Sequence, residues 1–113
     1  MKTDKDFATV RRFDFRTPRV PTNFSFSLDV ASTRTRYQAV CTDISENGLA
    51  AEILEPLAPK TLATLRLLLP GGVAPLEIRG SVEYSHGGRC GLTFLYSSWE
   101  ERDQVQKFIQ SIS

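Results

Sequence analysis

The stretch "LEIRGSVEYSHGGRCGLTFLY", residues 76–96, carries the strongest fold signal in the chain. Apolar and polar residues alternate before its central glycine pair, and a second apolar segment follows that pair. Alternation is typical of a half-buried strand, and Gly-Gly between two such segments is typical of a tight hairpin turn. We therefore expect an antiparallel hairpin, with one strand face formed by Leu76, Ile78, Gly80, Val82 and Tyr84.

Further strands are expected on the N-terminal side of this hairpin. Alternation marks "NFSFSLDV" (23–30), "RYQAVCTDI" (36–44) and "LAAEIL" (49–54). The segment "TLATLRLLLP" (61–70) fits a helix or a strand by propensity, and the neighbouring strands favour a strand. Short strands at even spacing with tight turns are typical of a small barrel.

The period of the apolar pattern changes at the C-terminus. In "SSWEERDQVQKFIQSIS" (97–113), Ser98 and Glu101 have the spacing of a capping box. We expect an amphipathic helix over 98–112 that covers an open end of the barrel. Its residues at helical spacing are Trp99, Arg102, Val105, Phe108, Ile109 and Ile112.

Composition excludes several classes of protein. The 113 residues fit one domain, and the net charge of +1 does not indicate a nucleic-acid polymer as partner. The start "MKTDKDFATV" predicts no signal peptide, and no apolar run predicts a membrane span. We therefore expect a cytoplasmic protein without membrane insertion, and a monomer.

Neither catalysis nor metal binding is indicated. His86 stands alone next to the glycine pair, in a turn, without a nucleophile at hand. Cys41 and Cys90 form no CxxC unit, and with a single His they give no metal-ligand set. Their apolar surroundings favour buried free thiols, and a disulfide would require the fold to bring them together. We expect no enzymatic activity, no catalytic residues, no metal and no cofactor.

Two motifs remain. The basic stretch "VRRFDFRTPRV" (10–20) contains an RxxxR spacing at Arg12 and Arg16, and residues 1–22 carry a net charge of +3 against −2 for the remainder. The second motif is "DISENG" (43–48), a DxSxxG pattern. Alone, it also describes a common turn in which Asp and Ser bond backbone amides and Gly takes a positive φ.

RxxxR followed by DxSxxG, with a β-rich remainder and a terminal helix, resembles the PilZ domain family from about Arg11 to Ile112. The resemblance implies a mostly β fold: a six-stranded antiparallel PilZ-type barrel with a C-terminal α-helix and a flexible N-terminal arm. It also implies a receptor, not an enzyme, for the bacterial second messenger cyclic di-GMP. The corresponding division is a flexible tail (1–10) and a PilZ domain (11–113), made of a ligand-binding arm (11–22), a barrel (23–96) and the helix (98–112).

The resemblance assigns Arg12 and Arg16 to the phosphates and guanine Hoogsteen edges of the ligand. An arginine fork matches both groups, and its plane also stacks on a base. Arg11 is expected to add such a plane, whereas Arg19, after Pro18, is expected to be a solvated charge. The arm should be mobile when free and become ordered when the ligand joins it to the barrel.

The resemblance assigns the second half of the site to the barrel turn. Asp43 accepts hydrogen bonds from the guanine N1–H and N2–H₂ groups, and Ser45 offers its hydroxyl to ligand or loop. Gly48 lets the chain turn and the ligand approach closely.

Two other functions stay open beside a cyclic di-GMP receptor that regulates an unknown effector protein. One is a PilZ-like adaptor for protein interactions that does not bind the nucleotide. The other is a barrel that binds RNA or single-stranded DNA, which the acidic balance of the barrel portion disfavours.

Overall fold

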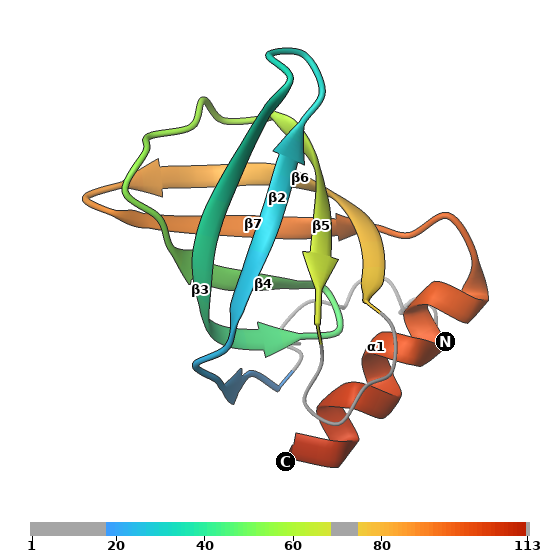
Figure 1. Ribbon diagram of the computed structural model, residues 1–113. Helices are drawn as coiled ribbons and strands as arrows, with labels where there is room; N and C mark the ends of the chain where they lie inside the picture. Colours follow the sequence, from blue (N-terminus) through green and yellow to red (C-terminus); the bar gives the residue numbers. More distant parts are fainter. Residues whose placement is uncertain (1–17, 69–74, 113) are drawn as a thin grey trace, which may run out of the picture.

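The computed structural model of the protein describes residues 18–68 and 75–112, which form a β-barrel and one helix (Figure 1). Among the predicted features, the tail (1–10) and Arg11, Arg12 and Arg16 lie outside the described residues. The elements are β1 (Val20–Pro21), β2 (Ser25–Val30), β3 (Thr35–Ser45), β4 (Gly48–Glu52), β5 (Leu62–Leu67), β6 (Leu76–His86), β7 (Arg89–Leu95) and α1 (Trp99–Ile112).

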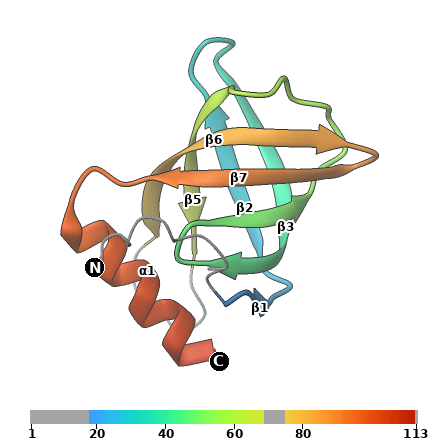
Figure 2. The ribbon, with the colours of Figure 1, turned by 180° about the vertical axis from the view of Figure 1, so that it is seen from behind.

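Six antiparallel strands close into a barrel, which confirms the predicted fold class. The strand order is β3-β2-β5-β6-β7-β4, and β4 pairs again with β3 to complete the circle (Figures 1 and 2). The segment 61–70, ambiguous in the sequence, contributes β5. The short β1 was not predicted. It pairs with β3 beyond the end of β2, with Val20 opposite Ile44 and Pro21 opposite Asp43.

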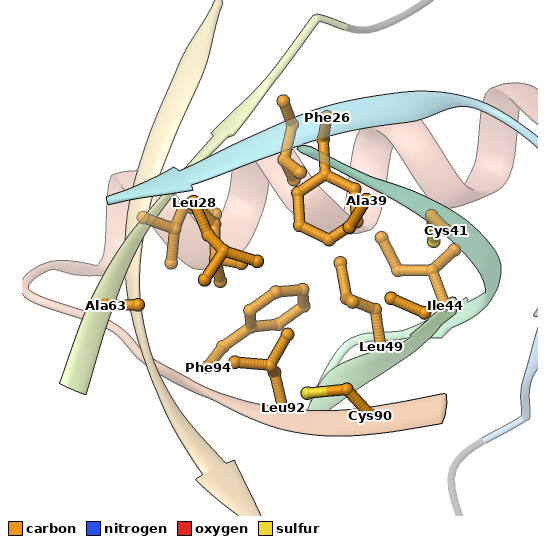
Figure 3. Close-up of a cluster of buried hydrophobic side chains, with 14 of the residues drawn as sticks. Phe26, Leu28, Ala39, Cys41, Ile44, Leu49, Ala63, Cys90, Leu92 and Phe94 are labelled. Atoms are coloured by element: carbon orange, nitrogen blue, oxygen red, sulfur yellow. The ribbon is translucent and has the colours of Figure 1, made fainter. Parts of the chain in front are cut away.

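The barrel interior is filled by the inward-facing side chains of the six strands. Figure 3 shows these side chains meeting between the strands, with Phe94 among them. This inner face is apolar on all six strands. Its fully buried members include Leu28, Cys41, Ile44, Leu49, Leu65, Leu67, Ile78, Val82 and Cys90.

The two cysteines are free and buried, as expected from their surroundings. Cys41 pairs with Ala51 across one strand boundary and Cys90 pairs with Ala51 across the next. Two strand spacings separate their Cα atoms by about 10 Å, which is beyond the reach of a disulfide. Burial raises the pKa of the Cys41 thiol to about 11, so this group stays protonated at neutral pH.

The β6–β7 hairpin has the predicted turn. Gly87 and Gly88 both take left-handed backbone conformations, with φ of 59° and 80°, between the paired His86 and Arg89. The inner face predicted for β6 is wrong at one residue, Tyr84. A register shift between Val82 and Tyr84 turns Tyr84 to the outside of the barrel, where its side chain is exposed. Such a bulge adds one residue and re-aims the side chains that follow it.

Helix α1 packs against the barrel through its predicted apolar stripe, near one end of the barrel in both views (Figures 1 and 2). The Phe108 ring meets the Phe24 ring edge-on, with centroids 5.6 Å apart. Ser98 accepts a hydrogen bond from the Glu101 N–H, as a capping box requires. Trp99 departs from the stripe: 78% of its surface is exposed, and the Arg102 guanidinium lies 5.6 Å from its ring centroid.

Gly48 is needed for a reason other than the positive φ that the turn interpretation predicted. Among the described glycines, only Gly87 and Gly88 have positive φ. A Cβ atom on Gly48 would overlap the backbone carbonyl oxygen of Leu92 on β7. The absence of a side chain therefore lets β4 begin directly against β7.

We predict that Gly48→Ala destabilises the protein by about 3 kcal/mol or more, because overpacking against backbone cannot be relieved by a side-chain rotation. Thermal or denaturant unfolding measures this loss. Gly87→Ala is the matched control, since its Cβ would meet nothing within 4 Å and only its φ of 59° is unfavourable. That strain should cost about 1–2 kcal/mol. Equal losses in the two variants would contradict the steric explanation.

Candidate functional site

The DxSxxG motif forms the β3–β4 hairpin. A register shift between Cys41 and Asp43 lets Cys41 and Ile44 both face the core while Asp43 faces outward. Ser45 and Gly48 pair across the two-residue turn that joins the strands. The Ser45 hydroxyl is buried and accepts a hydrogen bond from the Asn47 N–H at 3.2 Å. Ser45 was expected to offer its hydroxyl to the ligand or to the loop, and this contact supports the role in the loop.

A row of four residues crosses the outer face of the barrel from Asp43. Asp43 on β3 pairs with Ala50 on β4, Ala50 pairs with Gly91 on β7, and Gly91 pairs with Tyr84 on β6. Three strand spacings of about 4.8 Å separate the two ends of this row. The middle positions have almost no side chain, so no bulky side chain of this row stands between the carboxylate at one end and the aromatic residue at the other.

The Tyr84 ring lies over Gly91. A Cβ atom on Gly91 would overlap the Tyr84 ring at its Cε2 atom, so the ring rests on the backbone of the neighbouring strand. Tyr84 is nevertheless 49% exposed. An aromatic ring with one side on glycine and much of its surface accessible is a suitable platform for a flat ligand group.

Arg19 is bound to the motif aspartate, which corrects the expectation of a solvated charge. Its Nε donates a hydrogen bond to Asp43 Oδ1 at 2.5 Å, and its Nη2 lies 2.5 Å from the same oxygen. The side chains are 45% and 31% exposed, so the pair contributes at most about 1 kcal/mol to stability. The described end of the predicted arm thus meets the DxSxxG motif, held there by β1.

The motif turn is anchored on its inner side by β7 and by the residue that follows it. The Phe94 N–H donates to the Asn47 carbonyl at 2.9 Å, and the Tyr96 hydroxyl donates to the Glu46 carbonyl at 2.5 Å. Burial, and then the Glu46 carboxylate, raises the pKa of Tyr96 to about 12, so its hydroxyl stays a donor.

The Glu46 side chain reaches helix α1. Its Oε1 accepts hydrogen bonds from Arg102 Nε at 3.0 Å, from Arg102 Nη2 at 2.6 Å and from Gln106 Nε2 at 3.1 Å. Three donors on one carboxylate oxygen fix its position far better than a single surface ion pair would. The turn is therefore tied to both the barrel and the helix.

A shallow hollow of about 280 Å³ lies over this face. Arg19, Asp43, Gly48, Tyr84 and Arg89 are among the residues that line it. A larger hollow of about 550 Å³ lies beside Leu54 and shares Arg89 with the first, but no motif residue lines it. We therefore identify the smaller one as the candidate site, since it collects two carboxylates (Asp43 and Glu83), an aromatic ring and two cations.

Two other kinds of site are not found in the described part of the chain. Within residues 18–68 and 75–112, no group of three His, Cys, Asp or Glu side chains is placed to hold a metal ion. The one described helix is too short and too polar to cross a membrane.

Sequence reasoning missed Arg19, Tyr84 and Glu46 as members or supports of this site. For Tyr84 a signal was present, because counting outward from the Gly87–Gly88 turn pairs Tyr84 with Gly91. Arg19 and Glu46 had no comparable signal, since their partners lie 24 and 56 residues away.

Comparison with known proteins agrees with this architecture. The PilZ domain model matches residues 10–111, while no curated protein matches the chain. The PilZ domain of CeSA from a cellulose-synthesizing bacterium superposes with a TM-score of 0.74 at 18% identity, covering 84% of this chain and 97% of that one. A K. pneumonia MrkH–c-di-GMP complex superposes with a TM-score of 0.69 at 17% identity and 84% coverage, and this chain spans 50% of MrkH. The chain therefore belongs to the PilZ domain family.

Proposed function

We propose that this PilZ domain is a receptor for cyclic di-GMP that binds the nucleotide on the outer face of β3, β4, β6 and β7, without catalysing a reaction. The observation that carries the proposal is the Arg19–Asp43 contact, where the end of the basic arm meets the motif turn. Support also comes from the family, and from MrkH, a protein of the same fold whose solved structure is a complex with c-di-GMP.

The chemistry of the site suits a guanine base. Guanine presents two adjacent donors, N1–H and N2–H₂, which a carboxylate accepts with its two oxygens. Asp43 is directed outward and binds Arg19 through Oδ1 alone. We propose that one guanine edge lies on Asp43 and that a guanine ring stacks on Tyr84 above the Ala50–Gly91 floor. Gly48 would allow close approach of the ligand at the start of β4.

The phosphates require cations. We propose that Arg12 and Arg16 clamp the phosphates and the Hoogsteen edges of the bases, with Arg11 adding a stacking plane. Arg19 adds a positive charge beside Asp43, and its guanidinium has donors that the ion pair leaves for the ligand. Ser45 supports the turn rather than the ligand, because its hydroxyl is buried.

Binding would change the arm. The described end of the arm is paired with β3 through β1, so we propose that the ligand acts on the segment before residue 18. A new arrangement of that segment would present a changed surface to an effector protein, in the cytoplasm of a bacterium where the messenger is made. The ordering of the arm would be driven by the free energy of binding.

Isothermal titration calorimetry tests the proposed function. Cyclic di-GMP should bind, whereas GMP and a single-stranded oligonucleotide should bind much more weakly or not at all. If none of the three ligands bound, the proposed receptor function would be wrong, and the adaptor that does not bind the nucleotide would be favoured. Preferential binding of the oligonucleotide would favour the nucleic-acid barrel instead.

We predict that Asp43→Ala weakens cyclic di-GMP binding by about 1.5–3 kcal/mol, the cost of losing hydrogen bonds to a charged group. The variant should also lose preference for cyclic di-GMP over cyclic di-AMP, because the carboxylate reads the guanine donors. Glu77→Ala is the matched control: this carboxylate pairs with Arg66 on β5, at 2.9 Å, and should leave binding unchanged. If Asp43→Ala still rejected cyclic di-AMP as strongly as the unchanged protein, Asp43 would not be the base reader.

We predict that Tyr84→Ala weakens binding by about 1–3 kcal/mol, the range measured for a base stacked on an aromatic ring. Tyr84→Phe keeps the ring and should bind within about twofold of the unchanged protein. Calorimetry of both variants, with their thermal stabilities measured in parallel, separates stacking from folding. Equal affinities of the Ala and Phe variants would remove Tyr84 from the site.

A further inference from the structure

The motif turn and helix α1 share one charged cluster. Glu46 stands between Ser45 and Gly48, so its backbone belongs to the motif turn that borders the proposed nucleotide site. Its carboxylate oxygen is held by Arg102 and Gln106, one helical turn apart on α1. A change of the turn that displaces the Glu46 carboxylate must either move these two side chains or break their hydrogen bonds.

The same arginine also contacts the exposed ring at the start of the helix. The Arg102 guanidinium lies 5.6 Å from the Trp99 ring centroid, in the range of a cation–π interaction. A displacement of the Glu46 carboxylate would therefore move the Arg102 guanidinium, and this movement would change the contact between Arg102 and the Trp99 indole. Trp99 is 78% exposed, so a change in its contacts occurs at the protein surface.

We infer that Arg102 and Gln106 are positioning residues of the nucleotide site, and that through Glu46 the occupancy of that site is coupled to the Trp99 end of α1. The inference rests on the proposed function, because it takes the motif turn to be part of a ligand site. Coupling of this kind is reciprocal: contacts on α1 that favour one position of Glu46 change ligand affinity, and the ligand changes those contacts.

Glu46→Gln is a suitable variant for a test because the amide keeps the shape of the side chain while it removes the charge that attracts Arg102. Trp99 is the single tryptophan of the chain, so fluorescence emission reports on this end of α1 alone. Asp103→Asn is the matched control: it breaks an ion pair within the same helix, between Asp103 and Lys107 at 3.1 Å, without touching the turn.

Without ligand, Glu46→Gln should change the Trp99 emission, because Arg102 is released from its partner, whereas Asp103→Asn should not. In the unchanged protein, cyclic di-GMP should change the emission with the midpoint found by calorimetry. In Glu46→Gln, the affinity should fall about fivefold or more and the ligand-induced emission change should shrink. Asp103→Asn should retain both the affinity and the ligand-induced emission change of the unchanged protein. Circular dichroism and thermal unfolding confirm that the variants are folded.

Failure of the inference can be distinguished from failure of the proposed function. If calorimetry shows that cyclic di-GMP binds, but Glu46→Gln has unchanged affinity and an unchanged Trp99 response, the coupling is wrong and the receptor stands. If the ligand binds and Trp99 does not respond in the unchanged protein, the coupling is likewise overturned. If cyclic di-GMP does not bind the unchanged protein at all, the proposed function fails, and the coupling to that ligand fails with it. Arg102→Ala gives an independent repeat from the helix side, and should reproduce the affinity loss of Glu46→Gln.

Discussion

The pairing of β3 with β4 is the interaction on which the rest of the structure depends. It joins the two ends of a sheet that would otherwise be open, and so removes two strand edges and encloses the apolar inner face. Because the closing pair is a hairpin, its turn stands where the barrel closes. The DxSxxG motif occupies this turn, which places the candidate site at the closure itself.

The outer face at this point owes its character to two bulges and two small residues. The bulge in β3 directs Asp43 outward without moving Cys41 or Ile44 from the core, and the bulge in β6 directs Tyr84 outward after Val82. Regular strands would have placed different side chains there, since a shift of one residue exchanges the two faces. A bulge is thus the means by which a core strand delivers a side chain to a binding surface.

How well the sequence predicted each feature depends on how far apart in the chain the interacting residues lie. The hairpin at Gly87–Gly88 and the amphipathic stripe of α1 rest on local patterns, and both were predicted. The segment that forms β5 was ambiguous by propensity, and the neighbouring strands decided its assignment. Tyr84 was assigned to the wrong face because a bulge leaves the composition of a strand unchanged. β1 has too few residues to show a period, and it forms because β3 continues past the end of β2.

The candidate site was predictable only in part, for the same physical reason. The resemblance identified Asp43, Ser45 and Gly48 as neighbours of a ligand, and the fold brings them to one turn. Arg19 and Glu46 were missed because a long charged side chain leaves no pattern that names its partner. The roles of Arg11, Arg12 and Arg16 remain predictions that rest on the motif.

The two ion pairs at the motif turn, Arg19–Asp43 and Glu46–Arg102, differ in how easily a ligand could displace them. Among the described residues, Asp43 is held through one oxygen by one arginine, which directly precedes a two-residue strand, so a single side-chain rotation breaks this contact. Glu46 is held by two side chains of a helix that is itself packed through Phe108. A ligand that competes for Asp43 therefore displaces one exposed contact worth little free energy, while the turn keeps its attachment to α1. Because that attachment has more hydrogen bonds than the contact that is exchanged, the proposed coupling would pass a shift of the turn on to the helix.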